Sequence, residues 1–205
     1  MVTDTMTAGG EVRRAGNVEA RGFAIEGPLL LAVRRFADAR GVFIETYNHR
    51  DFAAIGIADA FMQDNQSLST RIGTVRGLHF QVPPDAQGKL VRVLRGRILD
   101  VAVDLRAGSA SFGQHVSAEL SAENGYMLWV PVGFAHGFVT REANTEVVYK
   151  VTRPYSPGCD RGMAWDDPAL GIDWGVDGAS ASLSDKDKNL PRLAELGLAE
   201  PGACF

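Results

Sequence analysis

The sequence is poor in cysteine and has no long apolar run. Its two cysteines, Cys159 and Cys204, lie far apart and show no Cys-x-x-Cys spacing, so a disulfide framework is not expected and a reducing compartment is favoured. No stretch approaches the roughly 20 apolar residues of a membrane-spanning helix, and the first 22 residues lack the apolar centre of a signal peptide. These absences predict a soluble cytoplasmic protein.

A dense basic run is also missing. Lysine and arginine total 21 against 25 aspartates and glutamates, which gives a net charge of −4. Nucleic-acid binding through phosphate neutralisation is therefore not expected, although a local group of arginine and lysine would suffice for a phosphorylated small molecule. The chain has 205 residues and is 45% hydrophobic, which is enough for one buried core.

Short β-branched and aromatic segments make up most of the chain after Phe23. Turn signals separate them, and strands do not alternate with helices, which is typical of an antiparallel sandwich or barrel. We expect a tight hairpin turn at Arg95-Gly96 and a second turn at Asn124-Gly125. The expected strands are residues 41–48, 91–94, 98–105, 115–120, 126–130, 139–140 and 145–152.

The ends of the chain differ from this β-rich region. Residues 1–20 are small, polar and glycine-rich, so we expect a flexible tail before a single domain over residues 21–205. A short helix is expected within residues 50–61, with Asp51 near its start. Another short helix is expected within residues 186–200.

One segment gathers residues that bind anions and move protons. Arg76 and His79 lie in "TVRGLHFQ", and Lys89 follows ten residues after His79. Strict strand alternation places Arg76 and His79 on opposite faces. A bulge at Gly77 would bring both to one side. Considered alone, His79 would more simply be a structural histidine, and Arg76 and Lys89 would be charged residues at a solvent-exposed sheet edge.

Two further residues are candidates for the same pocket. In "TEVVYKVT", Tyr149 shares a strand face with two valines and is expected to point inward. His136 ends the run "PVGFAH", where it would either point into a barrel mouth or be buried and bonded to backbone. A metal-binding barrel would need more ligands than the single histidine of "LHFQ" supplies, so we expect no metal. From the residues alone, the prediction is a β-barrel with a His/Lys/Tyr pocket suited to acid–base chemistry.

Motifs along the chain resemble one enzyme family. They include "DARGVFIETYN", "QDNQSLS", "VRGLHFQ", "VYKVTRPYSP" and "LSDKDKNLP", and in this order they are similar to the dTDP-4-dehydrorhamnose 3,5-epimerases from about Gly22 to Pro191. The resemblance implies a mainly β fold, an antiparallel jelly-roll or cupin-type β-barrel with a few short helices. It also implies a homodimer that works without metal or other cofactor.

The resemblance further implies an activity and a set of site residues. The family inverts C3 and C5 of dTDP-4-dehydro-6-deoxy-D-glucose, a dTDP-sugar, through an enolate. By this likeness His79 is the base, Asp187 its partner, Lys89 the group that stabilises the enolate and Tyr149 the general acid. Tyr155 would stack on the thymine. The implied substrate-binding residues are Arg40, Glu45, Gln63, Asn65, Arg76, His136, Tyr155, Asp160 and Lys186.

Three alternatives stay open at this point. A relative that inverts only C3 or only C5 of another dTDP-deoxysugar would use the same acid and base. A nucleotide-sugar-binding barrel without turnover is a second class, disfavoured because both His79 and Tyr149 are present. A metal-dependent cupin oxygenase is disfavoured by the shortage of ligands.

Overall fold

The computed structural model describes residues 10–198 and residue 205. Its helices are short: α1 spans His49–Ala54, α2 spans Asp185–Lys188, and a single 3-10 turn, η1, spans Leu193–Leu196. The strands are β1 Val12–Ala15, β2 Val18–Gly22, β3 Leu29–Val33, β4 Arg35–Asp38, β5 Gly41–Ile44, β6 Gln63–Ser69, β7 Val75–Gln81, β8 Lys89–Arg95, β9 Arg97–Asp104, β10 His115–Ser121, β11 Met127–Val130, β12 Phe134–Thr140, β13 Thr145–Val151 and β14 Asp160–Gly162.

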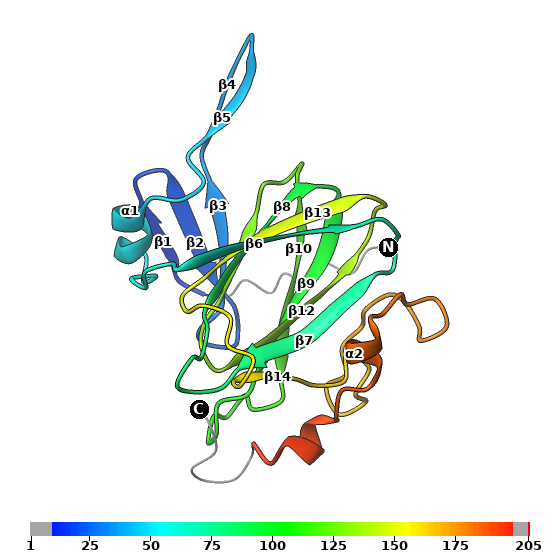
Figure 1. Ribbon diagram of the computed structural model, residues 1–205. Coiled ribbons are helices and arrows are strands. Elements are labelled where there is room, and N and C mark those ends of the chain that lie inside the picture. The colour runs from blue at the N-terminus through cyan, green and yellow to red at the C-terminus, as the bar shows by residue number, and fades with distance from the viewer. Residues whose placement is uncertain (1–9, 199–204) are drawn as a thin grey trace.

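Within the described residues the strands form two facing antiparallel sheets and one projecting hairpin (Figure 1). The seven-stranded sheet has the order β1-β2-β3-β11-β8-β13-β6, and the five-stranded sheet has the order β10-β9-β12-β7-β14. The hairpin, β4 with β5, extends away from both sheets. This two-sheet arrangement is the antiparallel jelly roll expected from the sequence.

Successive strands cross from one sheet to the other, which corrects one prediction. The turn at Gly96 exists, and this glycine has a φ of +78°, a value at which glycine carries little penalty. It does not close a hairpin, however, because β8 pairs with β11 and β13 whereas β9 pairs with β10 and β12. The connections from β10 to β11 and from β12 to β13 also change sheets. The turn residues were predictable, but the partner of each strand depends on contacts remote in sequence.

Apolar side chains fill the space between the sheets and cover the outer face of the smaller one. Val91, Val147 and Phe138 belong to the cluster between the sheets. On the outer face, Trp165 and Trp174 of the C-terminal segment pack against the five-stranded sheet. Because both faces of the smaller sheet are packed, its strands hold in fixed positions the side chains that line a cleft at its edge.

The N-terminal segment differs from the expected tail. Residues 1–9 lie outside the described part, but β1 and β2 fall within residues 10–22 and extend the seven-stranded sheet. Val18 and Ala20 are buried in a cluster with Leu31 and Phe52. Gly16, with a φ of +50°, and Asn17 form the turn between the two strands. The sequence did not predict β1 because this strand is charged and exposed and lacks an apolar alternation.

The helices follow their capping residues. Asn48 caps α1 by accepting a hydrogen bond from the backbone of Arg50, and Asp51 lies in its first turn as expected. At the C-terminal end, the expected helix is two separate turns, α2 and η1, because Pro191 interrupts it. Residues 199–204, which include Cys204, lie outside the described part. No described helix is long and apolar enough to cross a membrane.

Candidate active site

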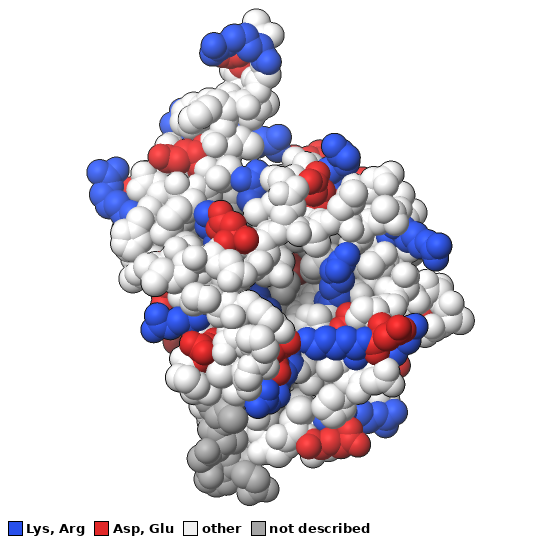
Figure 2. All heavy atoms as spheres, viewed as in Figure 1, with Lys and Arg blue, Asp and Glu red and all other residues white. Residues whose placement is uncertain are grey.

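A polar cleft opens between the edges of the two sheets and has two adjoining lobes. The Tyr155 lobe, about 340 Å³, runs toward Tyr155 and Asp160. The His136 lobe, about 400 Å³, runs toward His136 and Arg76. Figure 2 shows this face hollowed near its centre, with charged side chains around the hollow. The lobes share four residues, all of them titratable: His79, Lys89, Tyr149 and Lys186.

A bulge in β7 brings Arg76 and His79 to the same cleft. His79 lies opposite His136 in β12, but Arg76 lies opposite Phe138, so three steps along β7 match two along β12. Gly77 has a φ of +115°, and a Cβ on it would lie 2.7 Å from the carbonyl oxygen of His136. The conditional prediction from the sequence is therefore confirmed: the glycine permits the bulge, and both side chains line the His136 lobe.

His79 is paired with a buried carboxylate. Its Nε2 lies 2.6 Å from Oδ1 of Asp187, whose backbone N–H donates to the Ser184 hydroxyl that caps α2. Burial opposes ionisation of Asp187, but the hydrogen bond and charge of His79, with further hydrogen bonds from Ser184 and the backbone of Gly77, together outweigh it and hold the pKa of this carboxyl below its ordinary value. A carboxylate accepts, so Nε2 carries the proton and Nδ1 is the ring nitrogen left to act as a base.

Lys89 begins β8 at the junction of the lobes. Its ammonium group donates to the carbonyl oxygen of His79 at 3.2 Å, whereas the nearby carboxylate of Asp160 pairs with Lys186. Burial lowers the pKa of Lys89 to about 8, and the charges of Asp160 and Asp100 counter this only in part. The site therefore holds a desolvated cation with donor capacity to spare.

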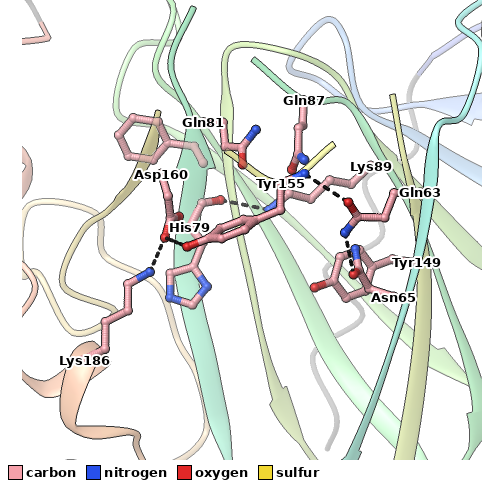
Figure 3. A pocket seen from close by; sticks show the side chains of 11 residues that line it. Gln63, Asn65, His79, Gln81, Gln87, Lys89, Tyr149, Tyr155, Asp160 and Lys186 are labelled. Carbon is pink, nitrogen blue, oxygen red and sulfur yellow. Dashed lines mark hydrogen bonds and ion pairs between the residues drawn. The ribbon is translucent and has the colours of Figure 1, made fainter. Parts of the chain in front are cut away.

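Tyr149 enters the cleft from β13, as its strand phase predicted. It packs against the core cluster that contains Val147 and lines both lobes; Figure 3 shows it in the Tyr155 lobe. Burial raises the pKa of its phenol, although the nearby charge of Arg76 acts in the opposite direction. The phenol is therefore held in its protonated form, which suits a proton donor.

The Tyr155 lobe carries polar groups around an exposed ring. The hydroxyl of Tyr155 donates to Asp160 at 3.2 Å, and the Lys186 ammonium group lies 2.5 Å from the same carboxylate. Gln63 donates to Asn65 at 2.8 Å and accepts from the backbone of Tyr155 at 3.0 Å. The structure thus brings these five predicted residues together, with Tyr155 56% exposed and open to a planar ligand.

His136 lies in the other lobe and is held by a side chain, not by backbone. Its Nε2 lies 2.7 Å from Oδ1 of Asp100, a residue that is fully buried. His136 and His79 are directly opposite each other in the β12–β7 pairing, so their side chains share the face that lines the cleft.

Two predicted residues do not reach the cleft of their own chain. Arg40 lies in the turn of the β4–β5 hairpin, paired with Asp38 at 2.6 Å and 90% exposed. Glu45, just after the hairpin, accepts hydrogen bonds from Asn17 and Asn48. The pocket surfaces built from this chain contain neither residue.

Sequence reasoning also missed several residues of the cleft. Gln81, Gln87 and Ser67 line it, and each lies within or beside a strand without any local signal of function. Asp100 could have been noticed, since a carboxylate between apolar residues in "ILDVAV" must find a partner when it is buried. Within residues 10–198 and 205, no three histidine, cysteine or acidic side chains cluster to hold a metal ion.

A jelly roll with a histidine–carboxylate pair, a desolvated lysine and a protonated tyrosine around one polar cleft defines an acid–base enzyme acting on a small polar molecule. The chain belongs to the dTDP-4-dehydrorhamnose 3,5-epimerase family, whose model matches residues 22–195. A curated dTDP-4-dehydrorhamnose 3,5-epimerase from Sinorhizobium fredii is 56% identical over 168 residues, which cover 82% of this chain and 85% of that protein.

Solved structures of the family have the same fold. The epimerase from Bacillus anthracis, with TDP and pyrophosphate bound, is 46% identical with a TM-score of 0.83 and covers 86% of this chain and 99% of that chain. The epimerase from Legionella pneumophila, in complex with dTDP-4-keto-L-rhamnose, is 40% identical with a TM-score of 0.82, covering 86% and 93%. The first of these relatives thus binds a thymidine nucleotide, and the second binds a dTDP-sugar.

Proposed function

We propose that this protein is an isomerase that inverts C3 and C5 of dTDP-4-dehydro-6-deoxy-D-glucose, giving dTDP-4-dehydro-L-rhamnose, in the cytoplasm. The observation that carries the proposal is the junction of the two lobes. There, a paired histidine, a desolvated lysine and a protonated tyrosine line one space. Such a set can take a proton from carbon, hold the resulting anion and return a proton.

The base acts on hydrogens made acidic by the C4 ketone. His79 removes the proton from C5 or C3 through Nδ1, while Asp187 holds the ring by Nε2 and stabilises the imidazolium that forms. The electron pair left on carbon moves into the ketone, so negative charge develops on the C4 oxygen. Lys89 stabilises this enolate, and burial strengthens the interaction because water competes poorly there.

Inversion requires a proton from the opposite face of the sugar ring. Tyr149 comes from β13 of the seven-stranded sheet, whereas His79 comes from β7 of the five-stranded sheet. A sugar between them is exposed to the base on one side and to the phenol on the other. Tyr149 donates its own proton to carbon and becomes a phenolate, while His79 keeps the abstracted proton as an imidazolium. Proton exchange with solvent restores both groups, and a second cycle at the remaining carbon completes the double epimerisation.

The Tyr155 lobe suits the nucleotide. A thymine ring stacked on the exposed ring of Tyr155 would gain about 1–3 kcal/mol, and Lys186 offers positive charge to a phosphate. Gln63 and Asn65 supply amide groups beside it. Arg76 lies in the His136 lobe near Tyr149, and there its guanidinium would donate hydrogen bonds to the bound substrate.

We also propose a homodimer in which the β4–β5 hairpin contacts a second copy of the chain. Phe43 is 70% exposed, and Phe36 and Val42 are exposed beside it. A two-stranded hairpin has little stability alone, and exposed aromatic residues favour a protein contact. Such a contact would carry Arg40 toward the partner's cleft, which accounts for its distance from its own.

A coupled assay tests the activity. The purified protein is mixed with dTDP-4-dehydro-6-deoxy-D-glucose and an NADPH-dependent reductase that accepts only the L-rhamno product. NADPH oxidation and recovery of dTDP-L-rhamnose are expected. A product inverted at only one carbon would identify the protein as a single-site epimerase of another deoxysugar. An unchanged substrate would indicate that the protein binds nucleotide sugars without converting them.

A further inference from the structure

The cleft contains a second histidine–carboxylate pair that the proposed mechanism does not use. His136 and Asp100 lie on adjacent strands, β12 and β9, and their positions are diagonal neighbours in the pairing. Nε2 of His136 lies 2.7 Å from Oδ1 of Asp100. His136 also lies directly opposite His79, so two histidines stand side by side, each with its own carboxylate.

Asp100 is not arranged as a residue that serves stability. It is 0% exposed, and its Oδ2 meets no hydrogen-bond donor among the described residues. A buried carboxylate with an unmatched oxygen lowers stability, and an apolar residue in its place is often neutral or better. Its one polar contact goes to a side chain that lines the cleft.

Asp104, four residues further along β9, shows the contrasting arrangement. It is equally buried, but both its oxygens are matched. The guanidinium and backbone of Arg106 and the hydroxyls of Ser109 and Ser111 donate to it. These contacts fasten the loop after β9. β9 therefore carries two buried aspartates. Asp104 has hydrogen-bond donors for both oxygens and lies outside the cleft, whereas the only side-chain partner of Asp100 among the described residues is His136.

We propose that Asp100 is a positioning residue for the epimerisation: it fixes His136 in the tautomer protonated at Nε2. This inference rests on the proposed function. A carboxylate acceptor requires a hydrogen on Nε2 of His136. The nitrogen offered to the sugar is then Nδ1, an acceptor for a hydroxyl hydrogen while the ring is neutral. Without Asp100 the ring could flip or change tautomer.

The effect on Lys89 follows from charge. Asp100 and Asp160 stabilise the cationic form of Lys89, and Lys186 opposes it. Removing the Asp100 charge therefore lowers the pKa of Lys89 below its value of about 8. The other titratable side chains that line the His136 lobe around Lys89 are Arg76, His79, His136, Tyr149 and Asp187.

The test compares Asp100→Asn with Asp104→Asn, His136→Asn and the double variant Asp100→Asn/His136→Asn. For Asp100→Asn we expect kcat to fall roughly 10²-fold, as for a misplaced group in an active site, with dTDP affinity unchanged. The alkaline limb of its pH–rate profile should move to lower pH. Asp104→Asn should melt at a lower temperature but keep the wild-type profile. At a pH below the alkaline limb, where Lys89 is charged in every variant, the double variant should be no slower than His136→Asn, because Asp100 acts there through His136.

Several results would overturn the inference. Equal kcat and pH profile in Asp100→Asn and Asp104→Asn would make Asp100 structural, and additive losses in the double variant would separate it from His136. If Asp100→Asn does not fold, ¹⁵N NMR of the wild-type imidazoles decides, since the inference requires His136 protonated at Nε2 and is refuted by the Nδ1–H tautomer. If the wild-type protein lacks epimerase activity, the proposed function fails, whereas the tautomer measurement still tests the pair.

Discussion

Nε2 of His79 lies 2.6 Å from Oδ1 of Asp187, although the two residues are 108 positions apart in the sequence. Asp187 belongs to α2, a single turn whose first residues are fastened by the Ser184 cap. The C-terminal segment therefore completes a site otherwise built on strands. A carboxylate fixed in this way decides which nitrogen of His79 faces the substrate.

The first prediction concerns this carboxylate. Asp187→Asn should lower kcat by roughly 10²- to 10⁴-fold, because the amide cannot stabilise the imidazolium and permits the wrong tautomer. The matched control is Asp185→Asn in the same turn, where the exposed carboxylate pairs with Lys188. Steady-state kinetics of both variants would check the prediction, and equal rates would remove Asp187 from the mechanism.

Tyr149→Phe tests the proton donor. The ring still fills its place against Val147, so binding of dTDP should change little, while the rate of inversion should fall at least 10²-fold through loss of general-acid catalysis. Tyr126→Phe, on a ring packed against the same core but outside the cleft, should have wild-type activity. An unchanged rate in Tyr149→Phe would assign the donor elsewhere.

The pH dependence follows from Lys89, whose pKa is lowered to about 8 by burial. Below this pH the ammonium is charged and can stabilise an enolate. As pH rises through about 8 the charge is lost, so kcat should fall there and not near the ordinary lysine value of about 10.5. Lys89→Arg, if active, should extend activity to higher pH. A wild-type profile flat to pH 10 would contradict the assignment.

The hairpin prediction is tested by size and activity together. Phe43→Asp places a charge on the most exposed aromatic residue of the β4–β5 hairpin. It should shift the mass in solution from twice 22.0 kDa toward 22.0 kDa, with a parallel loss of activity. Ile72→Asp, at a comparably exposed apolar residue of the β6–β7 connection, is the control. A wild-type protein that is monomeric at all concentrations and fully active would refute the dimer.

Strand periodicity predicted local features of the site better than its assembly. The two-residue period placed Tyr149 inward, and the glycine in "RGLH" marked the bulge that unites Arg76 with His79. The sequence could not assign β8 and β9 to different sheets, because strand partners are set by distant contacts. The pairing of Asp187 with His79 depended on family likeness, since one helical turn carries little local information.

Two residues mark further limits of the sequence. The position of Arg40 outside its own cleft was not predictable, because the hairpin that carries it projects from the sheets. Asp100 was overlooked because a single acidic residue in an apolar strand does not disclose its partner. Its role becomes visible once His136 is found 2.7 Å away.

Proton NMR of dTDP-4-dehydro-6-deoxy-D-glucose in heavy water tests the central claim most directly. With the wild-type protein, deuterium should enter at both C3 and C5, and His79→Ala should abolish both exchanges while still binding dTDP through the Tyr155 lobe. Exchange at one carbon would restrict the protein to single epimerisation. Exchange that persists undiminished in His79→Ala would contradict the assignment of His79 as the base.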